Sequence, residues 1–342
     1  MQKPGSGFAT IDHYEHKSRR AAINPFFSKQ KVAGLEPVLR QQIEIFAVRI
    51  ERNIASGEML EISVAFAALA IDILTEYAMD KSMGNLLRED YNKTMVNFFT
   101  GLGPMWVVGK HLPLLPWMFH RLPSWVISKT SGKLAAYKAW SENNLALVRR
   151  VMSESGSFAI EAKGHKTVFH ELLHADCLPP TSTKEADLLD EGDVVLSGGT
   201  QTMAHALQVI TYHLCANAAI LKRLREELDR VQPLGSTAPA SLQELEQLPY
   251  MTAVLTEGLR LSYGAVTRLA RIAPDRAIQY NDWVIPPGTP VGMSNGLTFH
   301  DENYFPDSHS FIPERWLDPE EKKRLDNVFA PFGRGTRMCL GI

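Results

Sequence analysis

Apolar residues recur at helical spacing through most of the chain. In the first half, a stripe of them lies three or four positions apart, at Leu39, Ile43, Phe46, Ile50 and Ile54. Gly57 follows as a stop signal, so we expect a core helix there. Residues 61–79 are apolar and rich in alanine, and residues 132–154 have a mixed polar face, so both segments predict further helices.

Capping signals mark the helices of the second half, because Ser and Asn side chains accept hydrogen bonds from the first backbone N–H groups of a helix. The predicted helices are residues 184–216 after the capping box Ser182/Glu185, residues 218–231 after Asn217, and residues 250–262 after Pro249. Ser241 and Glu244 form a further predicted capping box.

Past Gly264 the pattern becomes β-like. Residues 266–272 alternate in part, and a hairpin of residues 277–280 with 283–285 is predicted around Asn281-Asp282. Pro286-Pro287-Gly288 is a turn signal. We expect irregular loops over residues 104–123 and 296–331, which are rich in proline and aromatic residues.

Composition narrows the class of protein. The chain has 342 residues, of which 45% are hydrophobic, enough for a packed core. The net charge of -2 gives no electrostatic case for binding nucleic acid. Three cysteines, Cys177, Cys215 and Cys339, are too few and too scattered for a disulfide framework or a Cys₄ zinc site, and they fit a reducing compartment.

No segment reads as a signal peptide or as a membrane span. The first residues lack an apolar core, and the longest apolar run, about Ile62 to Ile71, is closed by Asp72. A span needs roughly 20 apolar residues. We therefore expect no transmembrane segment in this chain, and a soluble, cytoplasmic location for it.

A single cysteine near the end lies in a glycine-rich, cationic segment. Gly335 and Gly341 allow close approaches that a Cβ would block, and Arg334 and Arg337 place positive charge beside the sulfur of Cys339. Such charge favours the thiolate. A soft anionic sulfur next to a cation that can bind a carboxylate suits a haem, with its iron and its propionates. The alternative is an ordinary cysteine in a Gly/Arg loop, which is the usual case for a lone cysteine.

The cysteine belongs to a longer motif. The pattern Phe-x-x-Gly-x-Arg-x-Cys-x-Gly matches at Phe332, Gly335, Arg337, Cys339 and Gly341. This pattern resembles the haem-binding loop of the cytochrome P450 monooxygenases, and the chain resembles filamentous-fungal members of that family. The resemblance implies that Cys339 is the axial thiolate ligand of haem b and of its iron. It also implies that Phe332, Gly335 and Arg337 bind the cofactor.

Two adjacent glycines, Gly198 and Gly199, interrupt the long helical run. Each weakens a helix by roughly 0.5–1 kcal/mol relative to alanine. From the residues alone, a ligand lying against the helix and a tight helix crossing explain them equally well. The resemblance favours the ligand, since family members carry Ala/Gly-Gly-x-Asp/Glu-Thr above the haem. It implies catalytic roles for Gly199, Gln201 and Thr202, with Thr202 bonding dioxygen and helping to deliver protons. Gln201 departs from the family's acid and cannot donate a titratable proton.

Glu257 and Arg260 lie three apart on one predicted helix face, and most such pairs are surface salt bridges worth little. In the family this pair is buried and joined by the arginine of a Pro-Glu-Arg turn. Here that turn is Pro313-Glu314-Arg315-Trp316. The resemblance implies that Glu257, Arg260 and Arg315 have a structural role: they hold in place the segment of residues 332–341 that contains Cys339, called the cysteine loop below.

Further cofactor and substrate residues follow from resemblance. His16 and Arg20 lie four apart, which alone suggests a solvated basic turn, but the string through residues 24–28 resembles a family helix that contacts a haem propionate. Arg271 matches a second propionate-binding position. Ala265 and Val266 match substrate-facing positions, where plain strand packing is the alternative.

Taken together, the resemblance implies a mainly α-helical single domain over residues 1–342 with a small antiparallel β region, incomplete at both ends, without the N-terminal anchor region and the helix after the cysteine. The implied chemistry is haem-thiolate monooxygenation of a lipophilic small molecule, in secondary metabolism, using dioxygen and an NADPH-dependent reductase. Full-length relatives are expected at the endoplasmic reticulum membrane, and the chain is expected to act as a monomer. A haem-thiolate isomerase or dehydratase, and a non-catalytic remnant that cannot hold haem, remain as alternatives.

Overall fold

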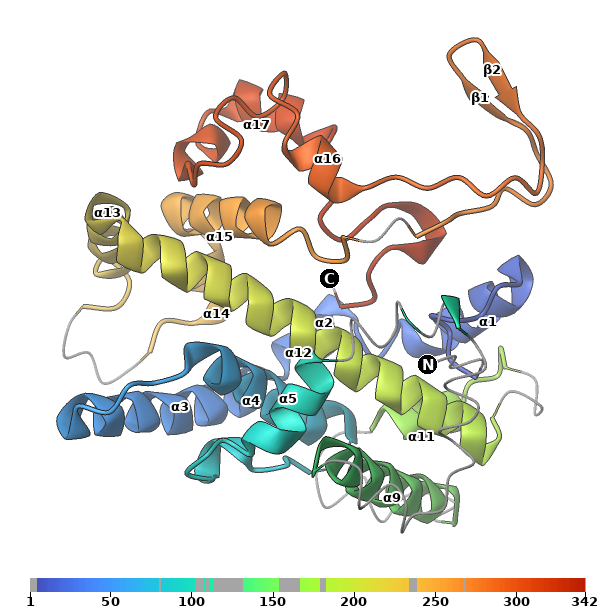
Figure 1. The fold of residues 1–342 in the computed structure, drawn as a ribbon, viewed down its shortest axis with the longest axis horizontal. Helices are drawn as coiled ribbons and strands as arrows, with labels where there is room; N and C mark the ends of the chain where they lie inside the picture. The colour runs from blue at the N-terminus through green and yellow to red at the C-terminus, as the bar shows by residue number, and fades with distance from the viewer. Residues whose placement is uncertain are drawn as a thin grey trace. The chain divides into compact units, whose positions relative to one another are not determined.

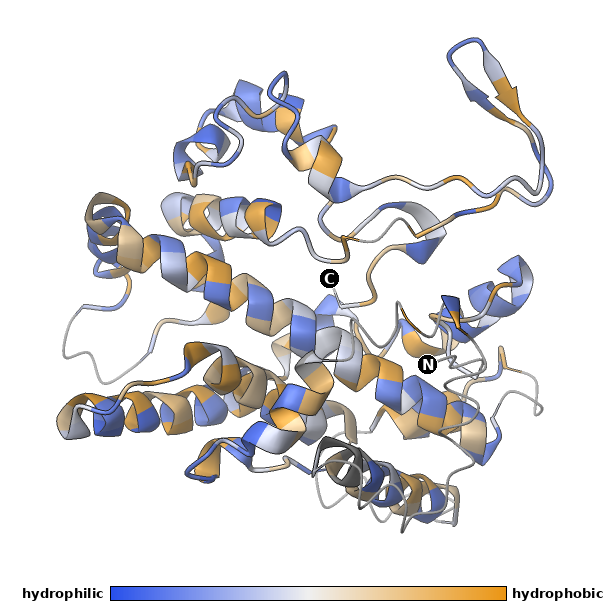
Figure 2. Ribbon diagram, viewed as in Figure 1, coloured by the Kyte–Doolittle hydropathy of each residue, from blue (hydrophilic) through white to orange (hydrophobic). Residues whose placement is uncertain are grey.

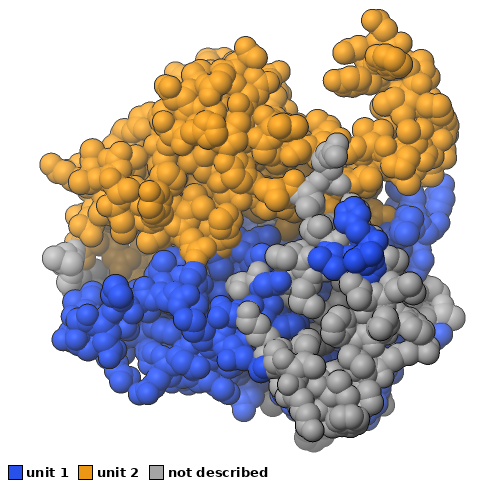
Figure 3. Space-filling view, viewed as in Figure 1, with its two compact units in different colours: residues 1–204, 340–342 blue, residues 205–339 orange. Residues whose placement is uncertain are grey.

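The chain folds into two units, coloured separately in Figure 3. Unit 1 is Met1–Ala204 with Leu340–Ile342, and unit 2 is His205–Cys339. The single domain expected over residues 1–342 stays a prediction. The computed structural model describes residues 5–79, 81–101, 108, 111–112, 132–153, 167–178, 183–233, 239–266 and 269–341.

Unit 1 is helical. Its elements are α1 (His13–Ile23), α2 (Lys29–Ala33), α3 (Glu36–Ser56), α4 (Ile62–Leu74), a π-helical turn (Thr75–Met79), a 3₁₀ turn (Asn85–Leu87), α5 (Lys93–Thr100), α9 (Gly132–Ser153), α11 (Val168–Leu173) and the first part of α12 (Glu185–Ala216) (Figure 1). The predicted helices over residues 39–54, 61–79, 132–154 and 184–216 are confirmed within a few residues at their ends.

Helix α4 forms the core of unit 1. It is mostly apolar, as the hydropathy colouring of Figure 2 indicates, and every residue from Val64 to Ile73 is buried. Asp72 is buried with them, and its carboxylate accepts hydrogen bonds from the Asn85 amide and side chain, both at 2.9 Å, and from the Leu86 amide at 2.8 Å. Burial raises the pKa of Asp72 above its usual value. The acid that closes the apolar run in the sequence therefore joins α4 to the following 3₁₀ turn.

Among the described residues, one helical stretch is long and apolar enough to cross a membrane, Ile62–Met79. Most of this stretch is buried inside unit 1, as in the core helix of a globular protein.

Helix α3 differs from the expectation of a core helix. It ends as predicted at Gly57, which has the left-handed φ of 71°. Its apolar stripe is only partly covered, because Phe46 is buried against Phe66 while Ile43 and Ile54 are 52% and 75% exposed. The prediction of burial was wrong here, since a stripe shows which face is apolar and not how much of it a neighbour covers.

Unit 2 contains the rest of α12, several shorter helices and a two-stranded sheet. These elements are α13 (Ala218–Leu228), α14 (Leu242–Glu246), α15 (Pro249–Ser262), β1 (Ile278–Tyr280), β2 (Trp283–Ile285), α16 (Asn295–Phe299), a 3₁₀ turn (Pro313–Trp316), α17 (Pro319–Asp326) and a second 3₁₀ turn (Gly335–Arg337). Both predicted caps form: Asn217 accepts from the Ala219 and Ile220 amides, and Ser241 with Glu244 makes a capping box.

The β region is smaller than the sequence suggests. The predicted hairpin forms, with Tyr280 opposite Trp283 and Asn281 at a φ of 50°. Among the described residues of 266–272, however, the backbone pairing is a single bridge from Arg271 to Val291, so the strand expected there is not observed. Positions 267 and 268 lie outside the described residues.

The prediction of a long irregular loop over residues 296–331 is also wrong. Helices α16 and α17 and a 3₁₀ turn occupy much of it. The proline-rich composition of this segment led to the wrong prediction, although a local capping signal was present. Asp318 is the N-cap of α17, and its side chain accepts a hydrogen bond from the Glu321 amide. Most of the loop expected over residues 104–123, and the Ser182 half of a capping box, lie outside the described residues.

Gly258 provides a test of the packing in unit 2. A Cβ at this position of α15 would lie 2.1 Å from Cγ1 of Ile210 on α12, so the Ile210 side chain occupies the space that a larger residue would need. We expect Gly258→Ala to lower the free energy of unfolding by about 1–3 kcal/mol through overpacking, despite alanine's better helix propensity. Urea unfolding of Gly198→Ala, where no atom lies within 4 Å of the new Cβ, is the control. Equal stability of the two variants would contradict this packing.

Candidate functional site

The two adjacent glycines of α12, Gly198 and Gly199, lie in different environments. A Cβ on Gly199 would lie 2.7 Å from Cδ1 of Leu74, at the end of α4, whereas a Cβ on Gly198 would meet no atom within 4 Å. Gly199 thus permits a close crossing with α4, and Gly198 leaves an open surface on the exposed side. The close approach to Leu74 fits the tight-packing interpretation for Gly199, and the interpretation that a ligand lies against the helix stays a prediction.

The exposed side of α12 also carries the predicted catalytic residues. Gln201 and Thr202 are exposed, while Thr200 between Gly199 and Gln201 is wholly buried. The Thr202 hydroxyl donates a 2.8 Å hydrogen bond to the Gly198 carbonyl, one helical turn earlier. This bond fixes the Thr202 side chain toward Gly198, on the side of the helix that Gly198 leaves open.

Helix α1, also in unit 1, presents His16 and Arg20 one turn apart. Asp12 starts this helix by accepting from the Tyr14 and Glu15 amides at 2.9 and 2.8 Å. His16 is buried and Arg20 is half-buried. The two predicted propionate-binding side chains therefore come from one helix turn, away from its most exposed face.

The cysteine loop in unit 2 is closed by its own backbone. The Cys339 amide donates to the Phe332 carbonyl at 2.8 Å, and the Met338 amide donates to the Gly335 carbonyl at 3.1 Å. Gly335 has a φ of 80°, a value that glycine adopts without strain. Arg337 is half-buried, and both Phe332 and Cys339 are exposed. The loop therefore presents the thiol at its surface, with Gly335 leaving an open approach beside it.

Two side chains anchor this loop to the elements before it. Arg334 donates to the carbonyls of Asp326, at the end of α17, and Phe329. Asn295, at the start of α16, donates to the Ala330 carbonyl at 3.2 Å. Arg334 was expected to act on the sulfur by its charge, but its guanidinium is directed to these backbone carbonyls.

The predicted Glu-x-x-Arg pair is wholly buried in α15. Arg260 binds Glu257 through two hydrogen bonds, from Nε to Oε2 at 2.9 Å and from Nη2 to Oε1 at 2.8 Å. The other donors of Arg260 reach the backbone carbonyls of Phe299, Ser308 and Ser310, at 2.8, 2.7 and 3.1 Å. All the guanidinium donors are thus used, which is the condition for a buried cation to be tolerated.

The carboxylate of Glu257 is equally well satisfied. The Ile312 amide donates to Oε1 at 3.0 Å, and the Trp316 indole N–H donates to Oε2 at 2.9 Å. Arg315 completes the group, with its Nε 3.5 Å from Oε1. Sequence reasoning missed Trp316 as a partner, although an indole N–H in a buried position normally needs an acceptor.

An aromatic cluster connects this buried pair to the cysteine loop. Trp316 packs on Phe329 with ring centroids 4.8 Å apart, and Phe299 packs on Phe329 at 5.4 Å. Phe329 lies three residues before Phe332, where the loop begins. Gly264, after α15, approaches the Pro331 carbonyl so closely that a Cβ would lie 3.3 Å from it. The position of the loop within unit 2 is therefore set by α15 and the 3₁₀ turn at residues 313–316.

Three predicted residues are not joined to this arrangement by any described contact. Arg271 is exposed and its Nη1 lies near the carbonyls of Leu269 and Ala270, at 3.4 and 3.2 Å. Ala265 and Val266 are exposed. Their cofactor and substrate roles stay predictions.

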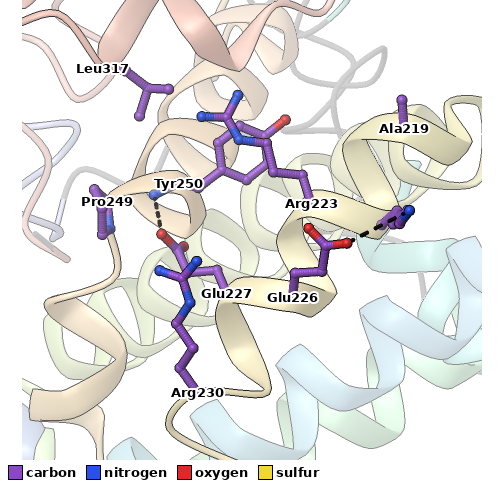
Figure 4. A pocket seen from close by; sticks show the side chains of 9 residues that line it. Ala219, Arg223, Glu226, Glu227, Arg230, Pro249, Tyr250 and Leu317 are labelled. Atoms are coloured by element: carbon purple, nitrogen blue, oxygen red, sulfur yellow. Dashed lines mark hydrogen bonds and ion pairs between the residues drawn. The ribbon is translucent and has the colours of Figure 1, made fainter.

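An open groove of about 570 Å³ lies between α13 and α15 (Figure 4). Glu227 accepts the Tyr250 and Met251 amides at 2.9 and 2.7 Å, so it caps α15. Arg223 lies over the Tyr250 ring and pairs with Glu314 at 2.8 Å. Burial, followed by the charge of Glu314, raises the pKa of Tyr250 to about 12. These groups hold one another and brace the turn that carries Arg315.

Comparison with known proteins identifies the family. The family model described as Cytochrome P450 matches residues 2–342. The chain is 38% identical over 341 residues to cytochrome P450 monooxygenase tpcC of Cochliobolus heterostrophus, covering 97% of this chain and 63% of that protein. It is 34% identical over 338 residues to fusicoccadiene C-8 hydroxylase of Alternaria brassicicola, covering 97% and 64%.

A third relative, conidiogenone synthase PchP450 of Penicillium rubens, is 34% identical over 343 residues, covering 99% of this chain and 67% of that protein. The chain belongs to the cytochrome P450 family, a class of haem-thiolate proteins, as the motifs predicted. Its mainly α-helical fold with a small antiparallel sheet is the fold expected for that family. It spans about two thirds of the length of these relatives.

The buried pair yields a quantitative test. Glu257→Ala leaves the Arg260 cation without its counter-charge in a dry site, so we expect a loss of about 3–5 kcal/mol in the free energy of unfolding. Glu321→Ala on α17 is a matched control, because Glu321 and Arg324 form the same i,i+3 pair at the surface, 39% and 41% exposed. Chemical unfolding should separate the two variants clearly, and a similar, small effect of both would show that the buried pair does not organise unit 2.

Proposed function

We propose that this chain is the haem-thiolate core of a monooxygenase that inserts one atom of dioxygen into a lipophilic small molecule. Electrons would come from an NADPH-dependent reductase. The observation that carries the proposal is the exposed Cys339 thiol, in a loop closed by the bond from its own amide to Phe332 and fixed through Phe329 to a buried ion pair. Membership of the cytochrome P450 family supports the same chemistry.

The residues present fit a haem b cofactor. Cys339 offers a soft thiolate ligand for iron, and within the described part of the chain a Cβ on Gly335 would meet no atom within 4 Å. Phe332 and Arg337 of the same loop, with His16, Arg20 and Arg271 as cationic or hydrogen-bonding partners for propionates, would hold the macrocycle. When bound, the haem supplies reductive activation of dioxygen, which no amino-acid side chain can perform.

The chain's own residues would position substrate and protons. Thr202 holds its hydroxyl proton on Oγ1, at the exposed side of α12 and within hydrogen-bond distance of the Gly198 carbonyl. Gln201 beside it can orient a water molecule by donating and accepting, but it has no proton to release at neutral pH. Gly199 would act indirectly, because it lets α12 pack on Leu74 and so fixes where Thr202 lies. Ala265 and Val266 are the proposed substrate contacts.

The relatives support a substrate class and a setting. One relative is named as a C-8 hydroxylase of fusicoccadiene, and another as conidiogenone synthase. We propose hydroxylation or epoxidation of an apolar secondary metabolite, by a protein that acts as a monomer at the endoplasmic reticulum membrane.

The test of the ligand is Cys339→Ala. With haem added to the full chain, reduction and carbon monoxide should give a strongly red-shifted Soret band only if a thiolate binds the iron. We expect the wild type and Cys215→Ala, which removes another exposed cysteine, to show this band, and Cys339→Ala to lose it. The proposal fails if the wild type shows no such band, or if Cys339→Ala retains it.

Gln201→Glu tests the proton supply. A carboxylic acid at this position can donate a proton that the amide cannot, so a larger share of the NADPH consumed should end in product and less in hydrogen peroxide. The gain should be smaller than the roughly 10²–10⁴-fold typical of general acid catalysis, because Thr202 is unchanged. Peroxide released per NADPH is the measurement, and Gln208→Glu, which adds the same charge to α12, is the control. An unchanged peroxide leak would contradict this role for position 201.

A further inference from the structure

The segment before α1 lies against the first turns of α12. The Gly7 amide donates to Oε2 of Glu191 at 2.6 Å, and the Gly5 amide donates to Oδ2 of Asp190 at 3.0 Å. A Cβ on Gly5 would lie 2.5 Å from Cα of Asp187, so the two backbones touch. Ser6, between the glycines, is wholly buried. Residues 5–7 are therefore held on α12 by two adjacent carboxylates.

Glu191 is the buried member of this carboxylate pair. Its residue exposure is 7%, and Arg19 of α1, whose positive charge acts on it, is 8% exposed. Burial raises the pKa of Glu191, while the Gly7 amide and Arg19 oppose that rise and the neighbouring Asp190 adds to it. A buried carboxylate of this kind is costly unless its partners are kept in place. Arg19 pairs with Glu15 of its own helix at 3.0 Å, and a Cβ on Gly7 would lie 3.7 Å both from Cβ of Arg19 and from Oε2 of Glu191. Glu191 therefore binds the segment through Gly7, beside the base of Arg19 on α1.

Both helices carry residues of the proposed site. On α1, Arg19 is adjacent to Arg20 and three residues after His16. On α12, Glu191 precedes Thr202 by eleven residues, about three helical turns or roughly 16 Å. A contact at Glu191 thus links the helix proposed to bind propionates with the helix proposed to handle dioxygen, within unit 1.

We propose that Glu191 is a positioning residue, which holds residues 5–7 and α1 against α12 and so sets the place at which His16 and Arg20 meet the haem. This inference rests on the proposed function for the role of α1, but the contact itself is a property of the haem-free chain. The core of unit 1 is formed by α4, so loss of the contact should displace the segment and α1 without unfolding the unit.

The experiment compares Glu191→Ala, Glu191→Gln and the control Glu185→Ala in the full chain. Glu185 lies on the same first turns of α12 but pairs at the surface with Arg149 of α9. Hydrogen–deuterium exchange of residues 5–23 is measured without haem, and hemin affinity is measured by absorbance titration. Glu191→Gln keeps an oxygen for the Gly7 amide and loses only the charge.

We expect Glu191→Ala to speed exchange of residues 5–10 about tenfold and to weaken hemin binding about tenfold, as the loss of one hydrogen bond to a charged group predicts. Glu191→Gln should restore most of the exchange protection and part of the affinity, and Glu185→Ala should match the wild type in both. Unchanged exchange in Glu191→Ala would refute the contact.

Faster exchange with unchanged hemin affinity would refute the positioning role. A wild type that binds no hemin would instead refute the proposed function, and the exchange data would still decide whether Glu191 holds the segment.

Discussion

The buried ion pair of Glu257 and Arg260 is the interaction on which the structure of unit 2 depends. Moving two charges out of water is expensive, and the pair is stable only because each remaining donor and acceptor has a partner. Those partners come from three separate stretches, residues 299, 308–310 and 312–316. The pair therefore fixes a long, mostly non-repetitive part of the chain to one helix, which hydrophobic packing alone would hold with less geometric precision.

The cysteine loop benefits from this arrangement without touching the charges. The indole N–H of Trp316 donates to Glu257, and its ring packs on Phe329, which lies shortly before the loop. In the proposed function Cys339 would bind iron, and such a ligand would need this support, because a ligand displaced by an ångström no longer meets its metal. The loop's own closure, from the Cys339 amide to the Phe332 carbonyl, then fixes the sulfur relative to that support.

Residues with a distinctive motif could be predicted from the sequence, and residues defined by their neighbours could not. The helix bounds, the two caps and the association of Glu257 with Arg260 and Arg315 follow from local spacing and from resemblance. The carbonyl partners of Arg260 could not be found, since every residue has a carbonyl and none is marked. Asp72 and Glu191 were missed because an acid looks the same in a sequence whether it meets water or buried amides. The apolar stripe of α3 was misjudged for the related reason that burial is decided by what lies opposite.

Because Arg260 donates to backbone carbonyls, the sequence of this region can vary in some ways and not in others. A carbonyl is present whatever the side chain, so positions such as Ser310, which is exposed, can be substituted without loss of the bond to the guanidinium. A change in the number of residues between α16 and the turn at Pro313 would instead move the acceptors out of reach. The segment from α16 to that turn should therefore vary in composition while its length stays constant, because the reach of Arg260 depends on chain length there rather than on residue identity.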